Sequence, residues 1–529
     1  MNKWKTVALL GLAQFVMVLD STVMNVSISK VVEDLHSSVT AMQGAITFYT
    51  LTMAALMLIG AKLGDIWGRK KAFLVGAVVY ATGSLITGLS PNMATLFLGW
   101  SVIEGLGAVL VIPAIAALVA NNYSGKDRVT AFAIIGAVSG AAVAAGPLIG
   151  GFVTTYFSWR YVFFSEVAIM ALVIMFSKAI KDSVKKVNSK IDILSALLSA
   201  TGLVLIVFGM LQSKTWGWII PHNSPSLNGH NINPLGISIV VYLIIAGSIL
   251  LRLFYSRQKK LEDGNENPLI KVSLLKVIQL RSGLGVLMGQ FIVTAGLFFA
   301  IPVYLQMTLG YDALTTGIRI FPLSIGLIAF SVIGTKLTSK WSPRKIIRLG
   351  QIILILSVLI LLSSVSVELK SKVFLVAMFF AGAALGLLSS QVGNVNMSAV
   401  DKKESSEIGG LQGLFQNLGS SLGTALIGSI FIAFLTSSFI NNVQSSSNLS
   451  SQIKSSVSEK SKSGISIIPV SDVNYIAQKK AVSASDGQLL TQIYAESQVN
   501  AMREALVGLI IVSLISLLLS KNIPNKIIK

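Results

Sequence analysis

Residues 60–71 read GAKLGDIWGRKK and join two apolar runs, at 42–63 and 72–89. Each run has about the 20 residues that an α-helix needs to cross a bilayer. The glycines permit a tight turn between antiparallel helices. Asp65 suits a helix N-terminus, where the helix dipole favours a carboxylate, and the basic residues 69–71 are typical of a short cytoplasmic loop. The stretch therefore predicts a transmembrane helical hairpin whose loop lies in the cytoplasm.

The composition excludes a soluble globular enzyme. Of the 529 residues, 53% are hydrophobic and 12% are charged, against about 25% charged in ordinary soluble domains. The chain has no cysteine, which excludes disulfides, thiolate metal sites and cysteine nucleophiles. The net charge of +20 comes from Lys and Arg in short loops, so we expect no nucleic-acid partner.

Apolar runs of this length recur along the chain. There are fourteen, at residues 6–29, 42–63, 72–89, 94–120, 129–153, 161–180, 191–213, 235–255, 282–305, 312–335, 346–366, 373–398, 408–436 and 501–520. The first contains Asp20 and leads into further runs without a small-residue cleavage site, so we expect no cleaved signal peptide. The sequence predicts an all-α polytopic membrane protein with fourteen transmembrane helices.

The basic residues indicate the orientation. With both termini in the cytoplasm, 30 of the 42 Lys and Arg residues fall on the inside and 12 on the outside, five of these in one long loop. Short cytoplasmic loops carry an excess of Lys and Arg. We therefore expect a multi-pass protein of a prokaryotic cell (plasma) membrane with both termini cytoplasmic.

The hairpin stretch has a second copy. Gly60, Lys62, Trp67 and the basic residues after it recur from Gly334 onward, an offset of 334 − 60 = 274 residues. Two parallel six-helix bundles related by an axis along the membrane normal produce such a repeat. We expect an N-terminal bundle at 1–185, a two-helix linker at 186–280 (helices 7 and 8) and a C-terminal bundle at 281–529.

The outer loop at about 437–500 is rich in serine and too polar to span the membrane. Its part from 488 to 506 has helical spacing and is expected to run into the last transmembrane helix. Two interpretations stay open: a flexible linker with a short amphipathic helix, or a lid or partner-binding hairpin.

The stretch 60–71 resembles the loop signature of the major facilitator superfamily. Further segments resemble its 14-transmembrane-helix drug:proton antiporter family, of the multidrug efflux type. They are 19–28 around Asp20, Gly146-Pro147 through Gly150-Gly151 after Gly136 and Gly140, 304–322, and 410–423. The resemblance covers residues 6 to about 430 and the last helix. It implies export of small, often lipophilic or cationic, compounds in exchange for protons by alternating access, with no cofactor.

The resemblance also marks residues that serve conformational change. Small residues let helix backbones approach closely, and proline removes a backbone donor where a helix can bend. The conformational residues implied are Gly60, Gly64, Asp65, Gly68, Arg69, Gly146, Pro147, Gly150 and Gly151.

The chain departs from the family in three of the predicted transmembrane helices. The family's helix-4 arginine is Ser101 here, and Glu104 stands at the following Gln position. Glu166 stands where relatives commonly carry Asn, and Gln416 replaces an arginine. Mechanisms that rely on those arginines are therefore not transferred to this chain.

Asp20, Glu104 and Glu166 are the candidates for proton coupling. A carboxylate at bilayer depth is costly and is a functional candidate by default, since a shielded carboxyl can hold a proton in one state and release it in another. The alternative for each is a structural role, as a neutral hydrogen-bonding group. Glu166, within the first two turns of its helix, is expected near the outer membrane surface.

Trp100 precedes Glu104 by four residues, which places both on one helix face. An aromatic ring beside a carboxylate can seat a lipophilic cation. The predicted substrate-binding residues are Trp100, Glu104, Asn25, Gln412 and Gln416. Hydrogen bonding between helices is the alternative for the amide side chains.

The sequence disfavours several mechanisms and kinds of functional site. No Gly-x-x-x-x-Gly-Lys-Ser/Thr phosphate loop is present, so ATP is not expected as the energy source. The histidines His36, His222 and His230 fall in outer loops, which argues against a histidine relay, a catalytic triad and a metal site. We expect a monomer in a lipid bilayer that handles a small-molecule substrate and protons. The alternatives are an exporter of an endogenous metabolite or lipid-like molecule, and a channel or non-transporting sensor.

Overall fold

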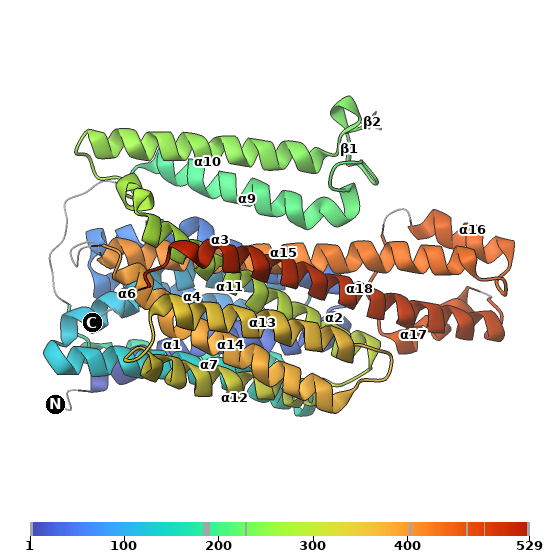
Figure 1. Cartoon of the computed structure of the whole chain (residues 1–529), viewed down its shortest axis with the longest axis horizontal. Helices are drawn as coiled ribbons and strands as arrows, with labels where there is room; N and C mark the ends of the chain where they lie inside the picture. Colours follow the sequence, from blue (N-terminus) through green and yellow to red (C-terminus); the bar gives the residue numbers. More distant parts are fainter. Residues whose placement is uncertain are drawn as a thin grey trace.

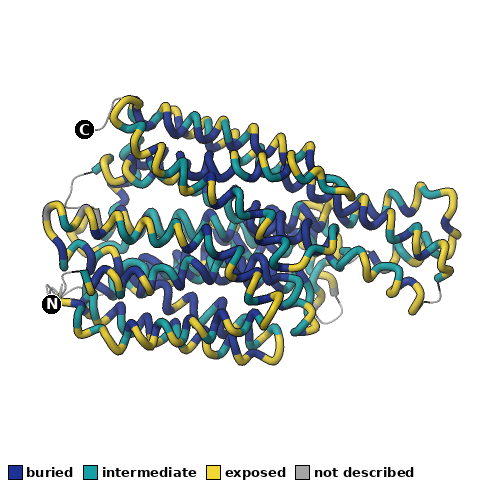
Figure 2. Tube along the Cα trace, turned by 90° about the horizontal axis from the view of Figure 1, so that it is seen from below, coloured by how far each residue is buried: buried dark blue, intermediate teal, exposed yellow. Residues whose placement is uncertain are grey.

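The chain folds almost entirely into α-helices that run along the long axis of the molecule (Figure 1). This computed structural model describes residues 4–182, 191–227, 230–400, 405–461, 464–480 and 482–525. Buried residues recur along the helices and are most frequent where the helices pack against one another (Figure 2).

Six of the predicted spans form the N-terminal bundle. Its helices are α1 (Lys5–Val26), α3 (Val39–Trp67), α4 (Arg69–Gly88), the continuous segment of α5 (Met93–Leu96), the π-helical η1 (Phe97–Glu104) and α6 (Gly105–Asn122), then α7 (Gly125–Tyr156) and α8 (Arg160–Met175). The short helix α2 (Ile28–Asp34) follows α1, and the 3-10 turn η2 (Ser177–Ala179) follows α8. Helix α4 packs against α6 and α8, and α1 packs against α7.

Six further spans form the C-terminal bundle. They are α11 (Ile278–Val303) with the π-helical η5 (Tyr304–Thr308), α12 (Ala313–Leu337), α13 (Pro343–Ser364), α14 (Ser371–Met397), α15 (Ser405–Ser445) and α18 (Ala484–Leu519), which ends in η8 (Ser520–Asn522). Helix α14 packs against α12 and α13, and α15 packs against α11 and α18. The bundles meet where α3 contacts α15 and α7 contacts α12.

Two linker helices lie along one side of the bundles (Figure 1). They are α9 (Ile193–Trp216) and α10 (Ile239–Asp263), which pack against each other, and α9 also contacts α3 and α15. Between them lie an antiparallel pair of two-residue strands, β1 (Ser226–Leu227) and β2 (His230–Asn231), and the turn η3 (Pro234–Gly236); η4 (Val272–Lys276) follows α10. The predicted boundary at residue 185 lies outside the described residues.

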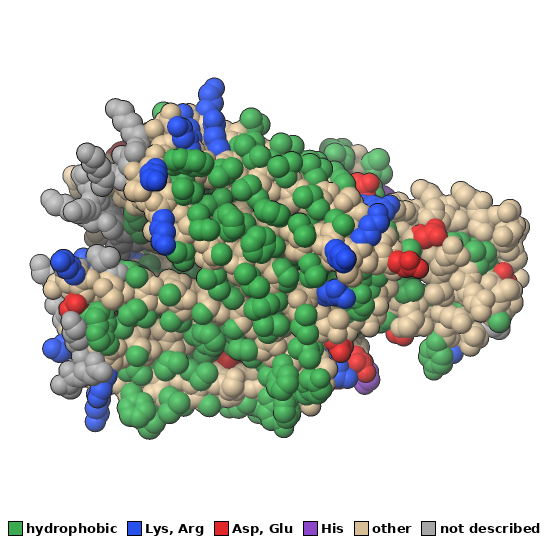
Figure 3. All heavy atoms as spheres, turned by 60° about the horizontal axis from the view of Figure 1, so that its bottom comes forward, with side chains coloured by type: hydrophobic (Ala, Val, Ile, Leu, Met, Phe, Trp, Pro, Cys, Tyr) green, Lys and Arg blue, Asp and Glu red, His purple; other side chains and the backbone are tan. Residues whose placement is uncertain are grey.

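Helix lengths and surface agree with a membrane protein. Thirteen helices among the described residues are long and apolar enough to cross a bilayer. The predicted span 161–180 corresponds to a fourteenth helix, the 16-residue α8, continued by η2. Hydrophobic side chains cover the flank of the molecule, with Lys and Arg toward both of its margins (Figure 3). Each of the fourteen predicted spans is therefore a helix, and α8 is shorter than expected.

Helix α1 begins and η8 ends at one end of the molecule, here called the terminal end (Figure 1). Helices α15 and α18, of 41 and 36 residues, project past the others at the opposite, distal end. The described residues between them include α16 (Ser451–Lys460) and α17 (Val470–Lys479). The prediction that 488–506 runs into the last transmembrane helix is confirmed. Its described residues are mostly helical and continue two transmembrane helices. Both interpretations of its role, a flexible linker with a short helix and a lid or partner-binding hairpin, stay predictions.

Candidate functional site

The turn between α3 and α4 joins the two helix ends tightly. Gly68 lies between them with φ of 97°, a backbone conformation that glycine adopts at little cost. Asp65 lies in the last turn of α3, not at a helix N-terminus as expected, and forms an ion pair with Arg69 at the start of α4. Arg69 also donates a hydrogen bond to the Ala61 backbone oxygen (3.2 Å). A Cβ atom on Gly64 would lie 3.0 Å from the Arg69 guanidinium, so the glycine leaves room for this contact.

Glycines of α3 and α7 allow close packing inside the N-terminal bundle. A Cβ atom on Gly60 would overlap the backbone of Val109 in α6, and one on Gly146 would overlap Thr22 of α1. A Cβ atom on Gly150 would lie 2.8 Å from the Val23 side chain.

The same segment of α7 also packs against the C-terminal bundle. A Cβ atom on Gly317 of α12 would overlap the backbone oxygen of Pro147, and one on Gly151 would lie 2.6 Å from the Ala313 backbone oxygen. The predicted conformational residues of α7 therefore lie at a contact between the bundles.

Hydrogen bonds cross between the bundles in the distal half. They join Gln43 Nε2 to the Thr424 oxygen (3.0 Å), Ser421 Oγ to the Thr47 oxygen (3.0 Å), Gln306 Nε2 to the Val26 oxygen (2.7 Å), Ser29 N to Gln306 Oε1 (3.1 Å) and Leu314 N to Thr155 Oγ1 (3.1 Å). The linker takes part, because Lys214 of α9 donates to Gln43 Oε1 (2.8 Å). These bonds form what we call the distal seal.

The three predicted carboxylates meet inside the N-terminal bundle. Asp20 of α1, Glu104 at the end of η1 and Glu166 of α8 are each 0% exposed, and one oxygen of each lies within 4.8 Å of the others. No other Asp, Glu, Lys, Arg or His of the described residues is buried. Glu166 lies within the first two turns of α8, as expected, but it is fully buried, because α8 packs on α4 and turns this side chain into the bundle.

A serine of α4 bridges two of the carboxylates. Ser84 Oγ lies 2.9 Å from Glu104 Oε2 and 3.0 Å from Glu166 Oε2. The other oxygen of each glutamate is buried without a hydrogen-bond partner. The glutamates from two helices are thus held through one hydroxyl group.

The third carboxylate is held by an aromatic pair. Trp100 Nε1 lies 3.1 Å from Asp20 Oδ1 and 2.9 Å from Asp20 Oδ2. The indole stacks on Tyr49 of α3, with ring centroids 5.0 Å apart. The predicted pairing of Trp100 with Glu104 is therefore replaced by one with Asp20, because the π-helical η1 changes the spacing of helix faces. The tyrosine also covers one face of the ring.

The three carboxylates have no basic partner. No ion pair between described residues includes any of them. Several buried negative charges without a counter-ion are very unfavourable, so a proton or another cation must neutralise part of the cluster. The three oxygens alone do not complete the shell that Ca²⁺ or Mg²⁺ requires, whereas a proton needs a single oxygen. Proton binding is the chemistry that this arrangement suits best.

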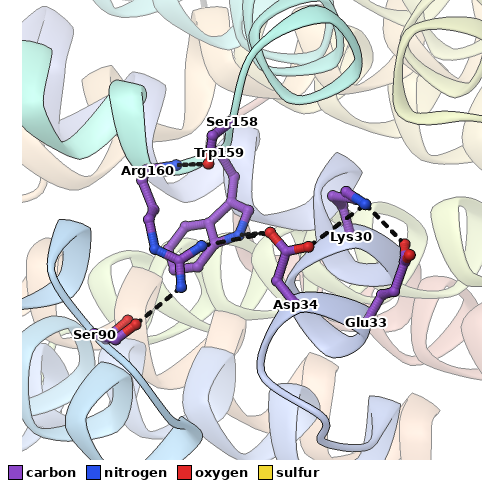
Figure 4. Close-up of polar contacts among 7 residues, drawn as sticks. All are labelled: Lys30, Glu33, Asp34, Ser90, Ser158, Trp159 and Arg160. Carbon is purple, nitrogen blue, oxygen red and sulfur yellow. Dashed lines mark hydrogen bonds and ion pairs between the residues drawn. The ribbon is translucent and has the colours of Figure 1, made fainter.

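A polar cluster at the distal surface fixes the start of α8 (Figure 4). Asp34 accepts hydrogen bonds from Trp159 Nε1 (3.0 Å) and Arg160 (3.4 Å), and Arg160 also donates to the Ser90 backbone oxygen (2.9 Å). The guanidinium lies 4.4 Å from the Trp159 ring centroid. Because Glu166 follows less than two turns later, this cluster helps to position it.

The other predicted substrate-binding residues lie apart from the carboxylates. Asn25 donates to the Ser21 oxygen of its own helix (2.6 Å), and Gln412 donates to the Gly393 oxygen (3.3 Å). Gln416 is partly exposed on α15. Their role in binding stays a prediction.

Sequence reasoning missed several partners of the site. Ser84 and Tyr49 are polar residues inside apolar helices, and only the packing of the helices shows that they face the carboxylates. Lys214 of the distal seal lies at the end of an apolar run, which is a common place for lysine, so its bond to Gln43 could not be predicted from the sequence.

The chain is similar in sequence to known transport and resistance proteins. The sequence model of the Major Facilitator Superfamily matches residues 10–424. The chain is 28% identical over 445 residues to the "Probable actinorhodin transporter" of Streptomyces coelicolor, covering 82% of this chain and 74% of that protein. It is 28% identical over 437 residues to a puromycin resistance protein of Streptomyces alboniger, covering 81% and 82%. It is 24% identical to the multidrug resistance protein Stp of Mycobacterium tuberculosis, covering 83% and 78%.

Solved structures share the fold. A bacterial homologue of the human lysosomal transporter Spinster, in an inward-facing and unoccupied conformation, superposes with a TM-score of 0.58 at 15% identity, covering 98% of this chain and 97% of that one. An auto-inhibited POT family peptide transporter gives a TM-score of 0.60 at 11% identity, covering 98% and 97%. With the family model matching most of its length, the chain belongs to the Major Facilitator Superfamily and is a multi-pass membrane transporter, not an enzyme.

Proposed function

We propose that this transporter is a proton-coupled antiporter that exports small lipophilic cations by alternating access, as a multidrug efflux protein. The buried cluster of Asp20, Glu104 and Glu166 without a basic partner is the observation that carries the proposal. Such a cluster must take up a cation to be stable, and protons and a cationic substrate would compete for the same negative charge. The relatives named for antibiotic transport and multidrug resistance favour this substrate class.

The contact between the bundles supports alternating access. The distal seal closes one end of the interface, and Gly317 against Pro147 brings α7 and α12 together there. Because these contacts are hydrogen bonds and glycine packing, parting the bundles at this end breaks no ion pair between described residues. The structure then corresponds to a form that is closed toward the distal side.

In this proposal the terminal end faces the cytoplasm. Residues 1–185 and 281–529 are the moving bundles, 186–280 is the linker, and the protein acts as a monomer. The absence of cysteine makes orientation easy to test, because a single introduced thiol is unique. We expect an impermeant maleimide added to intact cells to label Ser446→Cys at the distal end and not Ser339→Cys at the terminal end.

The proposed activity is tested with ethidium in inside-out vesicles under an imposed acid-inside gradient. We expect uptake by the wild type that collapses with a protonophore and is lost in Glu104→Gln. The matched control is Glu459→Gln, the same change on an exposed residue of α16, which should transport normally.

Other outcomes would contradict parts of the proposal. Uptake that persists with the protonophore would exclude proton coupling. Normal uptake in Glu104→Gln would move coupling to Asp20. No uptake by the wild type would favour export of an endogenous metabolite.

A further inference from the structure

The position of Ser84 follows from a close approach of two helices. Its neighbour Gly83 faces η1, and a Cβ atom there would lie 2.5 Å from the backbone nitrogen of Glu104. Because no side chain separates the helices, the short serine side chain reaches Glu104, and it also reaches Glu166 on α8. The hydroxyl is thus the common neighbour of two buried carboxyl groups.

The two contacts of Ser84 imply a proton on the glutamates. A serine hydroxyl has one hydrogen to donate, and an ionised carboxylate can only accept. If each contact is a separate hydrogen bond with its own hydrogen, Ser84 donates to one glutamate and accepts from the other. The accepting contact requires a carboxylic acid O–H, so at least one of Glu104 and Glu166 is protonated when both hydrogen bonds are present.

Asp20 is in a different environment. The Trp100 N–H lies within hydrogen-bonding distance of both of its oxygens. A donor shared by both oxygens stabilises the ionised carboxylate. The cluster therefore divides into an aspartate held by an N–H donor and two glutamates held by a hydroxyl that can donate and accept.

We propose that Ser84 is a positioning residue that holds Glu104 and Glu166 as a carboxyl pair with one shared proton, beside an ionised Asp20. Its hydroxyl can pass the proton between the two helices. Glu104 gives its proton to Ser84 Oγ while Ser84 gives its own to Glu166, so the serine is unchanged and one proton has moved from η1 to α8. The proposal rests on the proposed proton coupling and adds the route between the carboxyl groups.

The remaining titratable groups around the pair are few. Asp20 faces it from α1, Tyr49 from α3 and Tyr80 from α4. The tyrosines are buried, and the described residues place no basic side chain in an ion pair here. The pH dependence of the pair should therefore report mainly on the three carboxyl groups.

The test is infrared spectroscopy of the purified full-length protein in nanodiscs, which follows the carbonyl stretch of protonated carboxyl groups against pH. In the wild type we expect this band to be present at neutral pH and to titrate in two separate steps. Ser84→Ala removes the group that stabilises the singly protonated pair, so the two steps should merge. Ser84→Thr keeps the hydroxyl and should keep both steps.

Ethidium uptake supplies a second measurement. We expect Ser84→Ala to fall about tenfold, the scale for loss of a hydrogen bond to a charged group, with a narrower pH range of activity. Ser84→Thr should restore both. Ser513→Ala is the matched control, since Ser513 is buried and bonds only to the backbone oxygen of Leu509 in its own helix.

The outcomes separate the two proposals. A wild type that shows the two-step band but does not move ethidium would overturn the proposed substrate class and leave the carboxyl pair standing. If Ser84→Ala titrated like the wild type and Ser513→Ala, the bridging role would be overturned whatever the protein transports.

Discussion

The two bundles bury polar side chains of different kinds. The N-terminal bundle encloses three carboxylates, whereas the buried polar side chains described in the C-terminal bundle are neutral. There, Gln351 donates to Ser516 (2.9 Å), Gln290 to Ser389 (2.8 Å) and Gln391 to the Gly334 oxygen (3.1 Å). Equivalent folds thus have unequal chemistry: one bundle carries the titratable groups, and the other has hydrogen bonds that join its helices.

The two copies of the repeated loop also differ in their polar contacts, and the N-terminal copy again has the charged groups. In the N-terminal copy, Gly68 makes a tight turn and Asp65 pairs with Arg69. At the offset of 274 residues these positions are Ser342, Ser339 and Pro343. The C-terminal loop between α12 and α13 is longer and lacks the ion pair. The repeat therefore preserved the helices more closely than the polar contacts between them.

The largest expected effect tests directly whether the carboxylates of the N-terminal bundle carry the activity. Asp20→Asn removes the charge beside Trp100, and we expect proton-driven ethidium uptake to fall on the order of a hundredfold, the scale for loss of a proton-transferring side chain. Initial rates in inside-out vesicles measure it. Asp472→Asn, on the exposed face of α17, is the control. Unchanged uptake in Asp20→Asn would remove the aspartate from the coupling machinery.

The next effect concerns the contact between the bundles. In Gly317→Val the new side chain would overlap Pro147 and force α7 and α12 apart. We expect uptake to fall about tenfold, since overpacking costs on the order of 1–3 kcal/mol and each 1.4 kcal/mol is about a factor of ten in an equilibrium constant. A cysteine at Thr47, a buried residue of the distal seal, should become reactive to an external maleimide.

Gly136→Val is the matched control for that variant. It makes the same change on α7, but a Cβ atom on Gly136 has nothing within 4 Å. Equal labelling of Thr47→Cys in both variants would show that the Gly317 contact does not hold the distal side closed.

A smaller effect is expected in the C-terminal bundle. Gln351→Leu loses one hydrogen bond between α13 and α18, and such bonds in membrane proteins are worth about 0.6 kcal/mol on average. We expect a slightly lower thermal unfolding midpoint and uptake within about twofold of the wild type. A loss of uptake as large as that of Asp20→Asn would show that polar groups of the C-terminal bundle matter as much for transport as the carboxylates of the N-terminal bundle.

The smallest effect lies at one end of the linker helices, where Asp192 immediately precedes α9 and Arg257 lies in the last turns of α10. Arg257 donates to Asp192 from Nε (2.6 Å) and from a terminal guanidinium nitrogen (2.9 Å), and this bonding lowers the pKa of Asp192 from 3.8 to about 2. A lowered pKa in the folded state means that the stabilisation is full above pH about 4 and is lost as the pH falls toward 2.

The expected effect of removing the Asp192 charge follows from its lowered pKa. We expect Asp192→Asn to lower the unfolding midpoint by about 1 to 2 °C at pH 7. The difference from the wild type should shrink as the pH falls from about 4 to about 2. A difference that did not change with pH would show that the pair does not join α9 to α10 electrostatically.

The helices could be predicted from the sequence because apolar runs and bilayer thickness together determine their length. The three carboxylates could be predicted because charge is rare inside a membrane. The place where these three side chains meet could not be predicted from the sequence. It depends on the π-helical η1, which turns Trp100 toward Asp20, and on the Gly83 contact that brings Ser84 to Glu104. Neither the pitch of one helix nor the rotation of another is visible in a hydropathy pattern.

The length of α15 has a mechanical consequence. At about 1.5 Å per residue, its 41 residues measure about 60 Å, twice the roughly 30 Å of the hydrocarbon layer. A rigid lever of this kind amplifies rotation: a tilt of about 10° around the bilayer centre would sweep its tip through about 8 Å, estimated from the same rise per residue. The projection is therefore where a pair of spectroscopic probes would report rocking of the C-terminal bundle with the greatest gain.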